Sequence, residues 1–397
     1  MTKADRLRIA YLCDITPLNR NLYSGGNARL YDALQKHVGD VSILSNSWHS
    51  AEPVRRLMHA LPEAINIRAR WRTHLALARL ISRGVQRELA QGRYDVLFCA
   101  YSIQSMFRVE PPYPILKVFT SDATQTTYRN SEIGSFHKSA IRASRLLDPM
   151  IQGAEKHVLR NTDLQLWPST WLKSAADKLY GLGDTTSKHV PWGANLATPA
   201  PRITPTPIAR NAPLRLILIG RNWWAKGGPV AFETMKALRA RNIDARLTVI
   251  GCQPPDFHLN EFVTVHRQLD KGVPDQLALF EKTLDRAHFM VMPSYESYGF
   301  AFCEASAYGV PSLCLRVGGV PIRDGINGHA LPVTATVEDF ARRIEFYLDN
   351  PDAYWAISQS TRQEFETSLN WDAWGKRTAT LIHEARAARG LPSADAA

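Results

Sequence analysis

The chain of 397 residues lacks several features that mark whole classes of protein. No apolar run approaches the ~18 residues of a membrane-spanning helix. The N-terminal apolar stretch is short and is interrupted at Asp14, so we expect no secretory signal peptide. The five cysteines are scattered and odd in number, and none forms a Cys-x-x-Cys pair. This usage favours reduced, buried thiols in a cytoplasmic protein over a disulfide framework.

The sequence also lacks the common cofactor and metal motifs. It contains no Gly-x-Gly-x-x-Gly, no phosphate loop that ends in Gly-Lys-Ser/Thr, and no His-Glu-x-x-His or Asp-x-Asp. Its 12 histidines are dispersed along the chain. Because nicotinamide and flavin sites use the glycine fingerprint, and metal sites need clustered ligands, we expect neither a cofactor nor a metal ion.

Positive charge is in excess, and it is uneven. The formal net charge is +11, which suits an acidic partner such as a nucleotide-bearing substrate, an anionic membrane surface or nucleic acid. Residues 51–90 hold eight arginines against three glutamates. Their helical spacing predicts either a basic amphipathic helix that lies on anionic lipid or the solvated face of an ordinary packing helix. No nucleic-acid motif accompanies the charge, so we expect no nucleic-acid partner.

Short apolar runs alternate with helical patterns throughout the chain, which predicts parallel sheets with helices on both faces. The expected strands are 7–12, 41–46, 94–100, 114–121, 163–168, 214–220, 245–251, 263–268, 288–293 and 311–316.

A proline-rich stretch, "TPAPRITPTPIARNAP" at 198–213, is the clearest linker. It divides the chain into a first domain, 1–198, and a second, 212–370, and 371–389 is expected to form a final helix. We therefore expect an α/β protein of two Rossmann-like, doubly wound domains that face each other across a cleft. Open α/β sheets bind ligands beyond the carboxyl ends of their strands, so those positions are where chemistry is expected.

Two glycine turns follow expected strands. Gly25 and Gly26 come after the first strand of the first domain, where glycine lets a backbone approach a ligand closely or simply makes a tight turn. In the second domain, "GRNWWAKGGP" places Arg221 and Lys226 at a strand end before a helix. Two cations at such a place form either a clamp for a diphosphate or a pair of solvated surface charges.

Two glutamates lie in "PSYESYGFAFCEASAYGVP", 293–311, with seven residues between them. Gly299 and Phe300 are expected to begin a helix, whose first N–H groups could bind an anion. Glu296, before the helix, is expected to point into the cleft. Glu304 stands among apolar residues without a Lys or Arg three or four positions away. Its partner is expected to be either a pair of vicinal hydroxyls, such as those of a ribose, or a distant arginine.

These segments resemble those of a known family. The glutamate-containing stretch resembles the signature of the retaining glycosyltransferases of family 4, which have the GT-B fold. The two glycine turns are similar to that family's N-terminal glycine loop and Gly-Arg…Lys-Gly segment. "VPWGAN" (190–195), "VGGVPIRDGINGHALP" (317–332) and "NWDAW" (370–374) resemble further family motifs in the same order. The resemblance covers most of the chain.

The resemblance implies roles for named residues. Arg221 and Lys226 would bind the donor's diphosphate, Glu296 the transferred sugar, and Glu304 the ribose. The N–H groups of Gly299, Phe300 and Ala301 would contact sugar and phosphate, and Gly25 and Gly26 would also lie at the donor. The final helix would complete the first domain, which would bind the acceptor.

Two departures from the family pattern concern the sugar. A histidine is common after the fourth strand of the first domain, and here the stretch contains Ser121 and Asp122. Asp122 is expected to stand in as a sugar contact, although a carboxylate cannot donate a proton at neutral pH. The segment "GGVPIRDG" is shorter than usual and lacks a common glutamate.

The resemblance implies a retaining, metal-independent transferase. Its donor would be a UDP- or GDP-sugar, and its acceptor a carbohydrate or lipid-linked hydroxyl in surface polysaccharide or glycolipid assembly. The protein would be cytoplasmic, or peripheral at the inner face of the membrane. Two alternatives stay open: a non-catalytic sugar-nucleotide-binding protein, and a GT-B hydrolase or epimerase of sugar nucleotides.

Overall fold

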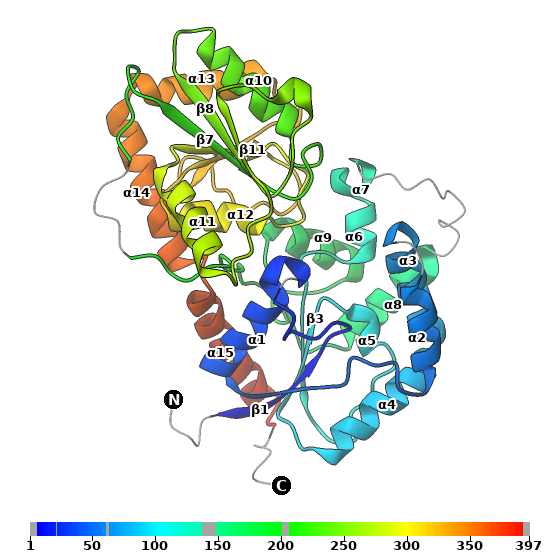
Figure 1. The fold of residues 1–397 in the computed structure, drawn as a ribbon. Coiled ribbons are helices and arrows are strands. Elements are labelled where there is room, and N and C mark those ends of the chain that lie inside the picture. Colours follow the sequence, from blue (N-terminus) through cyan, green and yellow to red (C-terminus); the bar gives the residue numbers. More distant parts are fainter. Residues whose placement is uncertain (1–5, 21, 61–62, 137–147, 201–205, 392–397) are drawn as a thin grey trace. The chain divides into compact units, whose positions relative to one another are not determined.

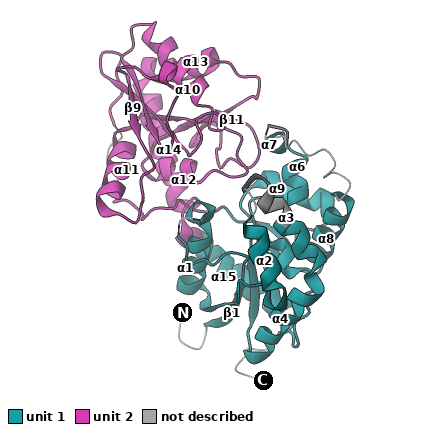
Figure 2. Cartoon of the chain, turned by 45° about the vertical axis from the view of Figure 1, so that its right-hand side comes forward, with its two compact units in different colours: residues 1–191, 374–397 teal, residues 192–373 magenta. Residues whose placement is uncertain are grey.

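The structure, a computed structural model, describes residues 6–20, 22–60, 63–136, 148–200 and 206–391. The chain folds into two compact units (Figure 2). Unit 1 comprises residues 1–191 and 374–397, and unit 2 comprises residues 192–373. The boundary thus falls before the proline-rich stretch at 198–213, of which residues 201–205 lie outside the described part.

Unit 1 contains a parallel sheet of six strands in the order β2-β1-β3-β4-β5-β6. Its central strands are buried apolar runs, as expected where helices cover both faces of a parallel sheet. The strands are β1 (Leu7–Leu12), β2 (Gly39–Ile43), β3 (Val96–Ala100), β4 (Leu116–Thr120), β5 (Leu164–Trp167) and β6 (Ser187–His189).

Unit 2 contains a second parallel sheet of six strands, in the order β12-β11-β10-β7-β8-β9. The strands are β7 (Leu214–Ile219), β8 (Ala245–Ile250), β9 (Val263–His266), β10 (Phe289–Val291), β11 (Ser312–Leu315) and β12 (Gly328–Leu331). All ten strands expected from the sequence are present. Sequence reasoning missed β6 and β12, each of which lies at one edge of its sheet.

Helices connect the strands and flank both sheets (Figure 1). In unit 1 they are α1 (Gly26–His37), α2 (Glu52–His59), α3 (Glu63–Ala76), α4 (Ala78–Gln91), α5 (Ile103–Met106), α6 (Gln125–Arg129), α7 (Glu132–Phe136), α8 (Asp148–Arg160) and α9 (Thr170–Tyr180). In unit 2 they are α10 (Gly228–Arg239), α11 (Pro274–Arg286), α12 (Phe300–Ala307), α13 (Val337–Asp349) and α14 (Pro351–Thr367). The 3-10 turns are η2 (Leu22–Gly25), η3 (His49–Ala51) and η5 (Asp256–His258).

The last helix, α15 (Trp371–Ala388), begins in unit 2 and continues in unit 1 from Trp374 onward. Within unit 1 the indole of Trp374 packs edge-on against Phe98 of β3, with ring centroids 6.2 Å apart. Further along, Arg386 pairs with Asp95 at 2.9 Å, and both side chains are buried. The residues of α15 from Trp374 are therefore part of the packing of unit 1.

Each sheet contains one place where the strand order reverses. In unit 1 the chain runs from β1 outward to β2 and then returns to the other side of β1 as β3. In unit 2 it runs from β7 outward through β8 to β9 and returns beside β7 as β10. The loops that leave the two strands beside a reversal diverge to opposite faces and leave a crevice, which is where open α/β sheets bind ligands. We call these places the switch point of each unit.

Candidate functional site

The loop between β7 and α10 carries Lys226 across the switch point of unit 2. A side chain at Gly220 would collide with the Lys226 stem, since its Cβ would lie 2.3 Å from Lys226 Cγ. Gly227 has φ 72°, and a Cβ there would lie 2.4 Å from the carbonyl oxygen of Pro293, just beyond β10. Gly227 is therefore needed for the loop to lie against the end of β10, and Gly220 is needed to make room for the Lys226 stem. They bring Lys226 next to the segment that holds Glu296.

Lys226 forms an ion pair with Glu296 Oε1. Both side chains are largely buried, with exposed fractions of 25% and 15%. Arg221, two residues beyond the last residue of β7, is exposed at the same strand end. Sequence reasoning expected these three residues at strand ends, and the structure gathers Lys226 and Glu296 at the switch point. It did not foresee that the cation and the carboxylate would bind each other.

Glu304 lies in the middle of α12, which begins after Gly299 and ends before Gly309, as the sequence predicted. Gly299 has φ 93°, a conformation that favours glycine. The Glu304 carboxylate is 5% exposed and forms an ion pair with Lys271, from the loop between β9 and α11. The sequence left a ligand or a distant arginine as its partner; within unit 2 the partner is a lysine. Sequence reasoning missed Lys271, because nothing local to either residue indicates the contact.

Residues from the "VPWGAN" segment brace the start of α12. The Trp192 indole stacks on the Phe300 ring, with centroids 5.7 Å apart and planes 4° from parallel. The hydroxyl of Tyr298 donates to the carbonyl oxygen of Trp192 at 2.6 Å. Gly193 allows close contact with the backbone at Asn370, since a Cβ would lie 2.4 Å from its carbonyl carbon. The backbone N–H groups expected to contact a donor, those of residues 299–301, thus lie on a rigid support.

The other predicted site residues belong to unit 1. Gly25 has φ 86° and directly precedes α1, so the expected glycine turn is present. Gly26 is the first residue of α1 and is buried. Asp122 lies in the short loop between β4 and α6, where Thr124 caps the helix by accepting from the N–H of Thr127. The structure therefore divides the predicted residues between the two units.

Unit 1 has a charged cluster at its switch point that sequence reasoning missed. Asp14 follows β1, and its carboxylate accepts a hydrogen bond from the Tyr23 hydroxyl at 3.1 Å and pairs with Arg70 at 3.2 Å. Tyr23 stacks on Tyr101, which follows β3, with ring centroids 4.3 Å apart. Tyr23, Ser24 and Tyr101 have φ values of 51°, 53° and 62°. Non-glycine residues held in this conformation cost energy and gather at functional sites.

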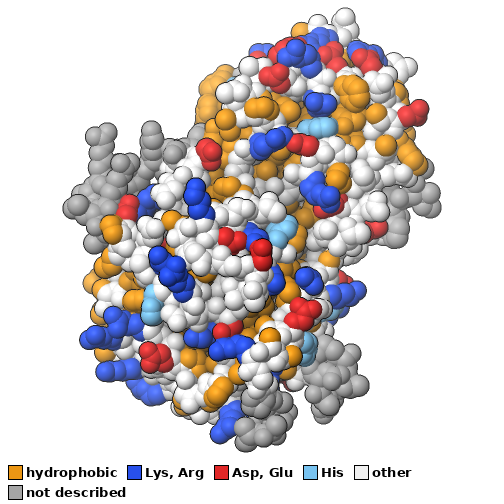
Figure 3. Space-filling model, turned by 180° about the vertical axis from the view of Figure 1, so that it is seen from behind, with side chains coloured by type: hydrophobic (Ala, Val, Ile, Leu, Met, Phe, Trp, Pro, Cys, Tyr) orange, Lys and Arg blue, Asp and Glu red, His pale blue; other side chains and the backbone are white. Residues whose placement is uncertain are grey.

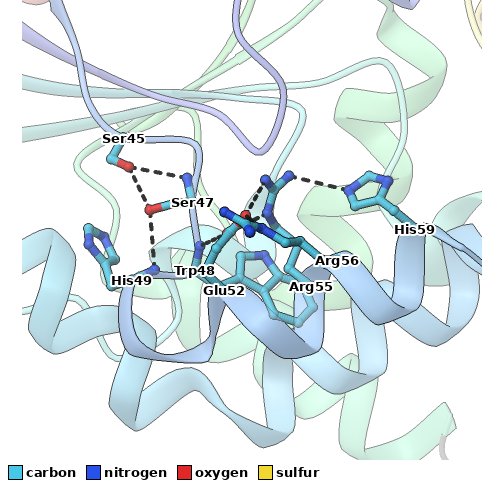
Figure 4. Close-up of polar contacts among 8 residues, drawn as sticks. All are labelled: Ser45, Ser47, Trp48, His49, Glu52, Arg55, Arg56 and His59. Atoms are coloured by element: carbon cyan, nitrogen blue, oxygen red, sulfur yellow. Dashed lines mark hydrogen bonds and ion pairs between the residues drawn. The ribbon is translucent and has the colours of Figure 1, made fainter.

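Much of the arginine-rich segment is paired. Figure 4 shows Glu52 at the start of α2 between Arg55 and Arg56. Arg55 donates to both carboxylate oxygens of Glu52, at 2.6 and 2.7 Å. This contact is the main reason why the pKa of Glu52 is lowered to about 2. Arg55 also contacts His59 Nε2 at 3.3 Å (Figure 4).

The arginines of this segment do not lie on one continuous helix. The chain leaves the helical path at Leu77, which separates α3 from α4. Leu77 packs against a small core of Trp48, Ala51 and Ile81, so tertiary packing overrides the helical spacing of the arginines. The exposed arginines of α4 lie opposite its buried apolar side, an arrangement that both interpretations of the charged face share. They are Arg79, Arg83 and Arg87. Arg68 lies among the side chains that the structure does not describe.

The other expectations for the described part of the chain concern surface charge, membrane-spanning helices and metal-binding clusters. On the face shown in Figure 3, basic side chains are interspersed with acidic ones, and several lie close together at the lower left. None of the described helices is long and apolar enough to cross a membrane. Among the residues described, His, Cys, Asp and Glu side chains do not gather in threes as a metal site would require. Metal independence stays a prediction.

Comparison with known proteins assigns the second half of the chain. Residues 213–350 match the family described as "Glycosyl transferases group 1". This stretch is similar to a glycosyl transferases group 1 domain. This domain coincides with most of unit 2 and includes β7, α10, α12 and the Lys226–Glu296 and Lys271–Glu304 pairs.

Relatives extend the likeness beyond the group 1 domain. A glycogen synthase of Mycobacterium tuberculosis is 26% identical over 256 residues, which cover 63% of this chain and 61% of the relative. A D-inositol 3-phosphate glycosyltransferase of Pseudarthrobacter chlorophenolicus is 27% identical over 256 residues, 59% of this chain and 58% of the relative. The matched region thus spans about six tenths of the length of these relatives.

A solved structure supports the fold over nearly the whole chain. Sucrose-phosphate synthase from Thermosynechococcus elongatus superposes with a TM-score of 0.67 at 18% identity, covering 96% of this chain and all of that one. The GT-B fold expected from the resemblance is therefore confirmed. The assignment to the retaining family 4 in particular stays a prediction.

Proposed function

We propose that this protein is a retaining glycosyltransferase that moves a sugar from a nucleoside diphosphate to an acceptor hydroxyl without a metal ion. The observation that carries the proposal is the Lys226–Glu296 pair at the switch point of unit 2, beside Arg221 and near the start of α12. The glycosyltransferase names of the relatives agree with it. We place the protein in the cytoplasm.

The residues suit the departure of a diphosphate. When the bond between the anomeric carbon and the diphosphate oxygen breaks, the leaving group keeps the electron pair and gains negative charge. Arg221 and Lys226 supply positive charge at that place, and the N–H groups at the start of α12 add hydrogen-bond donors. Charges that are already positioned stabilise the transition state without reorganisation. This is how the site could work without a metal.

The carboxylates suit the sugar nucleotide. As the leaving group departs, the sugar ring becomes oxocarbenium-like, and a nearby carboxylate tolerates its positive character. We assign Glu296 to the hydroxyls of the transferred sugar and Glu304 to the ribose. The acceptor hydroxyl attacks the face that the diphosphate leaves, and its proton passes to the departing phosphate oxygen. A new bond from the anomeric carbon to the acceptor oxygen forms with retention of configuration.

We propose that unit 1 binds the acceptor, a carbohydrate or lipid-linked hydroxyl of surface polysaccharide or glycolipid assembly. Asp122 would contact the sugar in place of the family's histidine. The exposed arginines of α4, together with Arg56 in α2, are the basis for proposing attachment to an anionic membrane surface. The pairing of Arg55 and Arg70 with carboxylates removes two charges from that surface.

Nucleotide binding tests the proposal first. Melting temperatures would be measured with UDP, GDP, ADP and TDP, each with and without EDTA. A ligand at ~100 times its dissociation constant adds about 2.7 kcal/mol to the free energy of unfolding. We expect one nucleotide to stabilise the wild type regardless of EDTA, and to lose its effect in Glu304→Ala. Glu233→Ala, which removes an exposed glutamate of α10, is the matched control.

The reaction itself separates transfer from the alternatives. With the stabilising nucleotide as a sugar donor, the anomeric configuration of the product would be read by NMR. The same anomer as in the donor supports the proposal, and the inverted anomer contradicts it. Sugar released or altered without an acceptor would indicate a hydrolase or an epimerase. Binding without any turnover across acceptors would indicate a non-catalytic protein.

A further inference from the structure

A buried histidine reaches the loop between β7 and α10 from a different segment of unit 2. His258 is the last residue of η5, which follows β8, and its side chain is buried. Its Nδ1 accepts a hydrogen bond from the indole N–H of Trp223 at 3.1 Å. In the sequence Trp223 stands between Arg221 and Lys226. The hydrogen bond therefore joins the segment after β8 to the loop that carries both cations of the candidate site.

Aromatic rings enclose the imidazole of His258. The ring centroids of Phe232 and Phe257 lie 4.6 Å from that of the imidazole, and the centroid of Trp223 lies at 5.6 Å. Phe232 belongs to α10 and is itself buried. A proton on His258 would place a charge among these apolar groups. Burial is accordingly the main reason why the pKa of His258 is lowered from its ordinary value of 6.5.

The side chain of Trp223 in turn fixes the course of the loop. A Cβ at Gly228, the first residue of α10, would lie 2.1 Å from Cδ2 of the Trp223 indole, so the indole lies directly on the start of the helix. The N–H of Gly228 donates to the carbonyl oxygen of Trp223 at 2.8 Å, and the N–H of Lys226 donates to that of Asn222 at 3.0 Å. Lys226 belongs to the same hydrogen-bonded turn, so a displaced indole would also displace its ammonium group.

We propose that His258 is a positioning residue of the candidate site: through Trp223 it holds the β7–α10 loop, and with it Lys226, in the place where a diphosphate would bind. The hydrogen bond requires an unprotonated Nδ1. A proton there would turn the acceptor into a donor that faces another donor. Nucleotide affinity should therefore weaken in acid, because the loop loses its support. The inference rests on the proposed function.

Charged side chains on α10 and η5 act on His258 as well. Glu233 of α10 raises its pKa and Lys236 of the same helix lowers it, both after the larger effect of burial. These two side chains pair with each other at 3.0 Å, so their effects partly cancel. Asp256 of η5 is exposed, and the cations of the β7–α10 loop are not among the groups that shift the pKa. His258 is therefore neutral at neutral pH and binds a proton only as the pH falls below 6.5.

The competing explanation is that His258 only fills space among the aromatic rings. Leucine is apolar and close to histidine in volume, whereas asparagine is smaller but carries an amide oxygen near the position of Nδ1. If packing alone matters, His258→Leu is the milder change and His258→Asn the more severe one. If the hydrogen bond to Trp223 matters, the order for nucleotide affinity is reversed, because only asparagine keeps an acceptor for the indole N–H.

The test measures dissociation constants by calorimetry between pH 7.5 and 5.0, for whichever of UDP, GDP, ADP and TDP binds most tightly. At pH 7.5 we expect His258→Asn to bind within about twofold of the wild type and His258→Leu about threefold to tenfold more weakly, which is the contribution of one hydrogen bond. Toward pH 5.0 the wild type should lose about threefold or more in affinity relative to His258→Asn, whose amide does not titrate. Phosphate groups also titrate at about pH 6, so the ratio of the two dissociation constants is compared at each pH.

Further variants keep the test decisive. Trp223→Phe removes the donor of the hydrogen bond, and adding His258→Leu to it should weaken nucleotide binding no further. His329→Asn, on β12, replaces another histidine of unit 2 whose pKa is lowered, and it should behave as the wild type at every pH. The melting temperature of each variant without nucleotide establishes that it is folded at the pH of the measurement.

Two results would overturn the inference. One is a His258→Leu variant that binds the nucleotide at pH 7.5 as tightly as His258→Asn or more tightly. The other is a ratio of dissociation constants between wild type and His258→Asn that stays the same at every pH. Either result leaves the proposed function standing, because a nucleotide still binds. A wild type that binds none of the nucleotides would instead defeat the proposed function, and this inference with it.

Discussion

The switch points of the two units use the same topology for different chemistry. In unit 2, Lys226 and Glu296 face each other over glycine-rich backbone, in a loop that follows a recognisable motif. In unit 1, Asp14 is bound by Arg70 and by Tyr23, whose backbone is in the left-handed region. Both clusters lie where parallel strands diverge. Only the first lies inside the region that matches a known family.

Under the proposed function, the difference separates a donor site from an acceptor site. A nucleoside diphosphate presents the same two phosphates whatever sugar it carries, so its binding calls for the same kinds of charged group. An acceptor differs from one enzyme to another, and its site is built from residues specific to each chain. We therefore expect changes at the switch point of unit 2 to abolish the reaction, and changes at that of unit 1 to act through stability or acceptor binding.

The largest effect is expected at Lys226. Lys226→Met removes the charge that stabilises the leaving diphosphate in the proposed mechanism, and it leaves Glu296 without its partner. Loss of one such group commonly costs about 10²–10³ in kcat, and we expect a loss of this size with the protein still folded. Lys236→Met, on an exposed face of α10, is the control. A variant with more than a tenth of wild-type kcat would remove Lys226 from the proposed mechanism.

A second prediction addresses the switch point of unit 1. Arg70→Met leaves the Asp14 carboxylate, 7% exposed, without its cation. Removing one partner of a buried pair costs about 3 kcal/mol or more. We therefore expect the free energy of unfolding of unit 1 to fall by that amount. Affinity for the nucleotide should stay unchanged. Adding Asp14→Asn to Arg70→Met should restore most of the lost stability. If Arg70→Met also lowers the affinity for the nucleotide, the two switch points do not have separate roles.

The acid stability of unit 1 gives a third test. Burial lowers the pKa of His74 from 6.5 to about 4, against the raising effect of Asp14 and with a small lowering effect of Arg70. The native state therefore holds His74 neutral while the unfolded chain binds a proton. Stability is present above pH 6.5 and is lost as the pH falls toward 4, by about 3 kcal/mol in all.

We expect His74→Phe to reduce this pH dependence, measured as the free energy of unfolding at several values between pH 7.5 and 4.5. His383→Phe, at an exposed position of α15 in the same unit, should leave the dependence as it is in the wild type. Equal slopes for wild type and His74→Phe would show that another group carries the acid sensitivity of unit 1.

Local patterns predicted much of the fold and part of the geometry of the candidate site. Apolar runs bounded by glycine and proline identify strands and helix ends, because both signals act within a few residues. Gly299 and Gly309 thus delimited α12 correctly, and the isolation of Glu304 among apolar neighbours indicated that its partner comes from elsewhere. The edge strands β6 and β12 escaped, because they are short and their residues include serine, lysine, glycine and histidine.

Contacts between distant residues could not be predicted. The Asp14–Arg70 pair joins positions 56 residues apart, and the Lys271–Glu304 pair joins positions 33 apart. No periodicity encodes such pairs, since they depend on which loops the sheet brings together. The break at Leu77 has the same origin: a half-buried leucine packs on Trp48, and that packing outweighs an uninterrupted helical pattern.

The smallest effect on the folded protein is expected on α4, where the arginines face solvent. Replacing Arg79, Arg83 and Arg87 by Gln should change the free energy of unfolding by less than about 0.5 kcal/mol per site and leave nucleotide affinity unchanged, because no packed group is lost.

Each basic residue near an anionic bilayer contributes ~1 kcal/mol of attraction. If unit 1 attaches to membranes, vesicles with anionic lipid should retain the wild type at low salt and retain the triple variant far less. Lys282→Gln with Arg286→Gln, on α11 of unit 2, should leave retention nearly intact. A wild type that such vesicles do not retain would mean that α4 is only a solvated face, and that the acceptor reaches unit 1 without help from these charges.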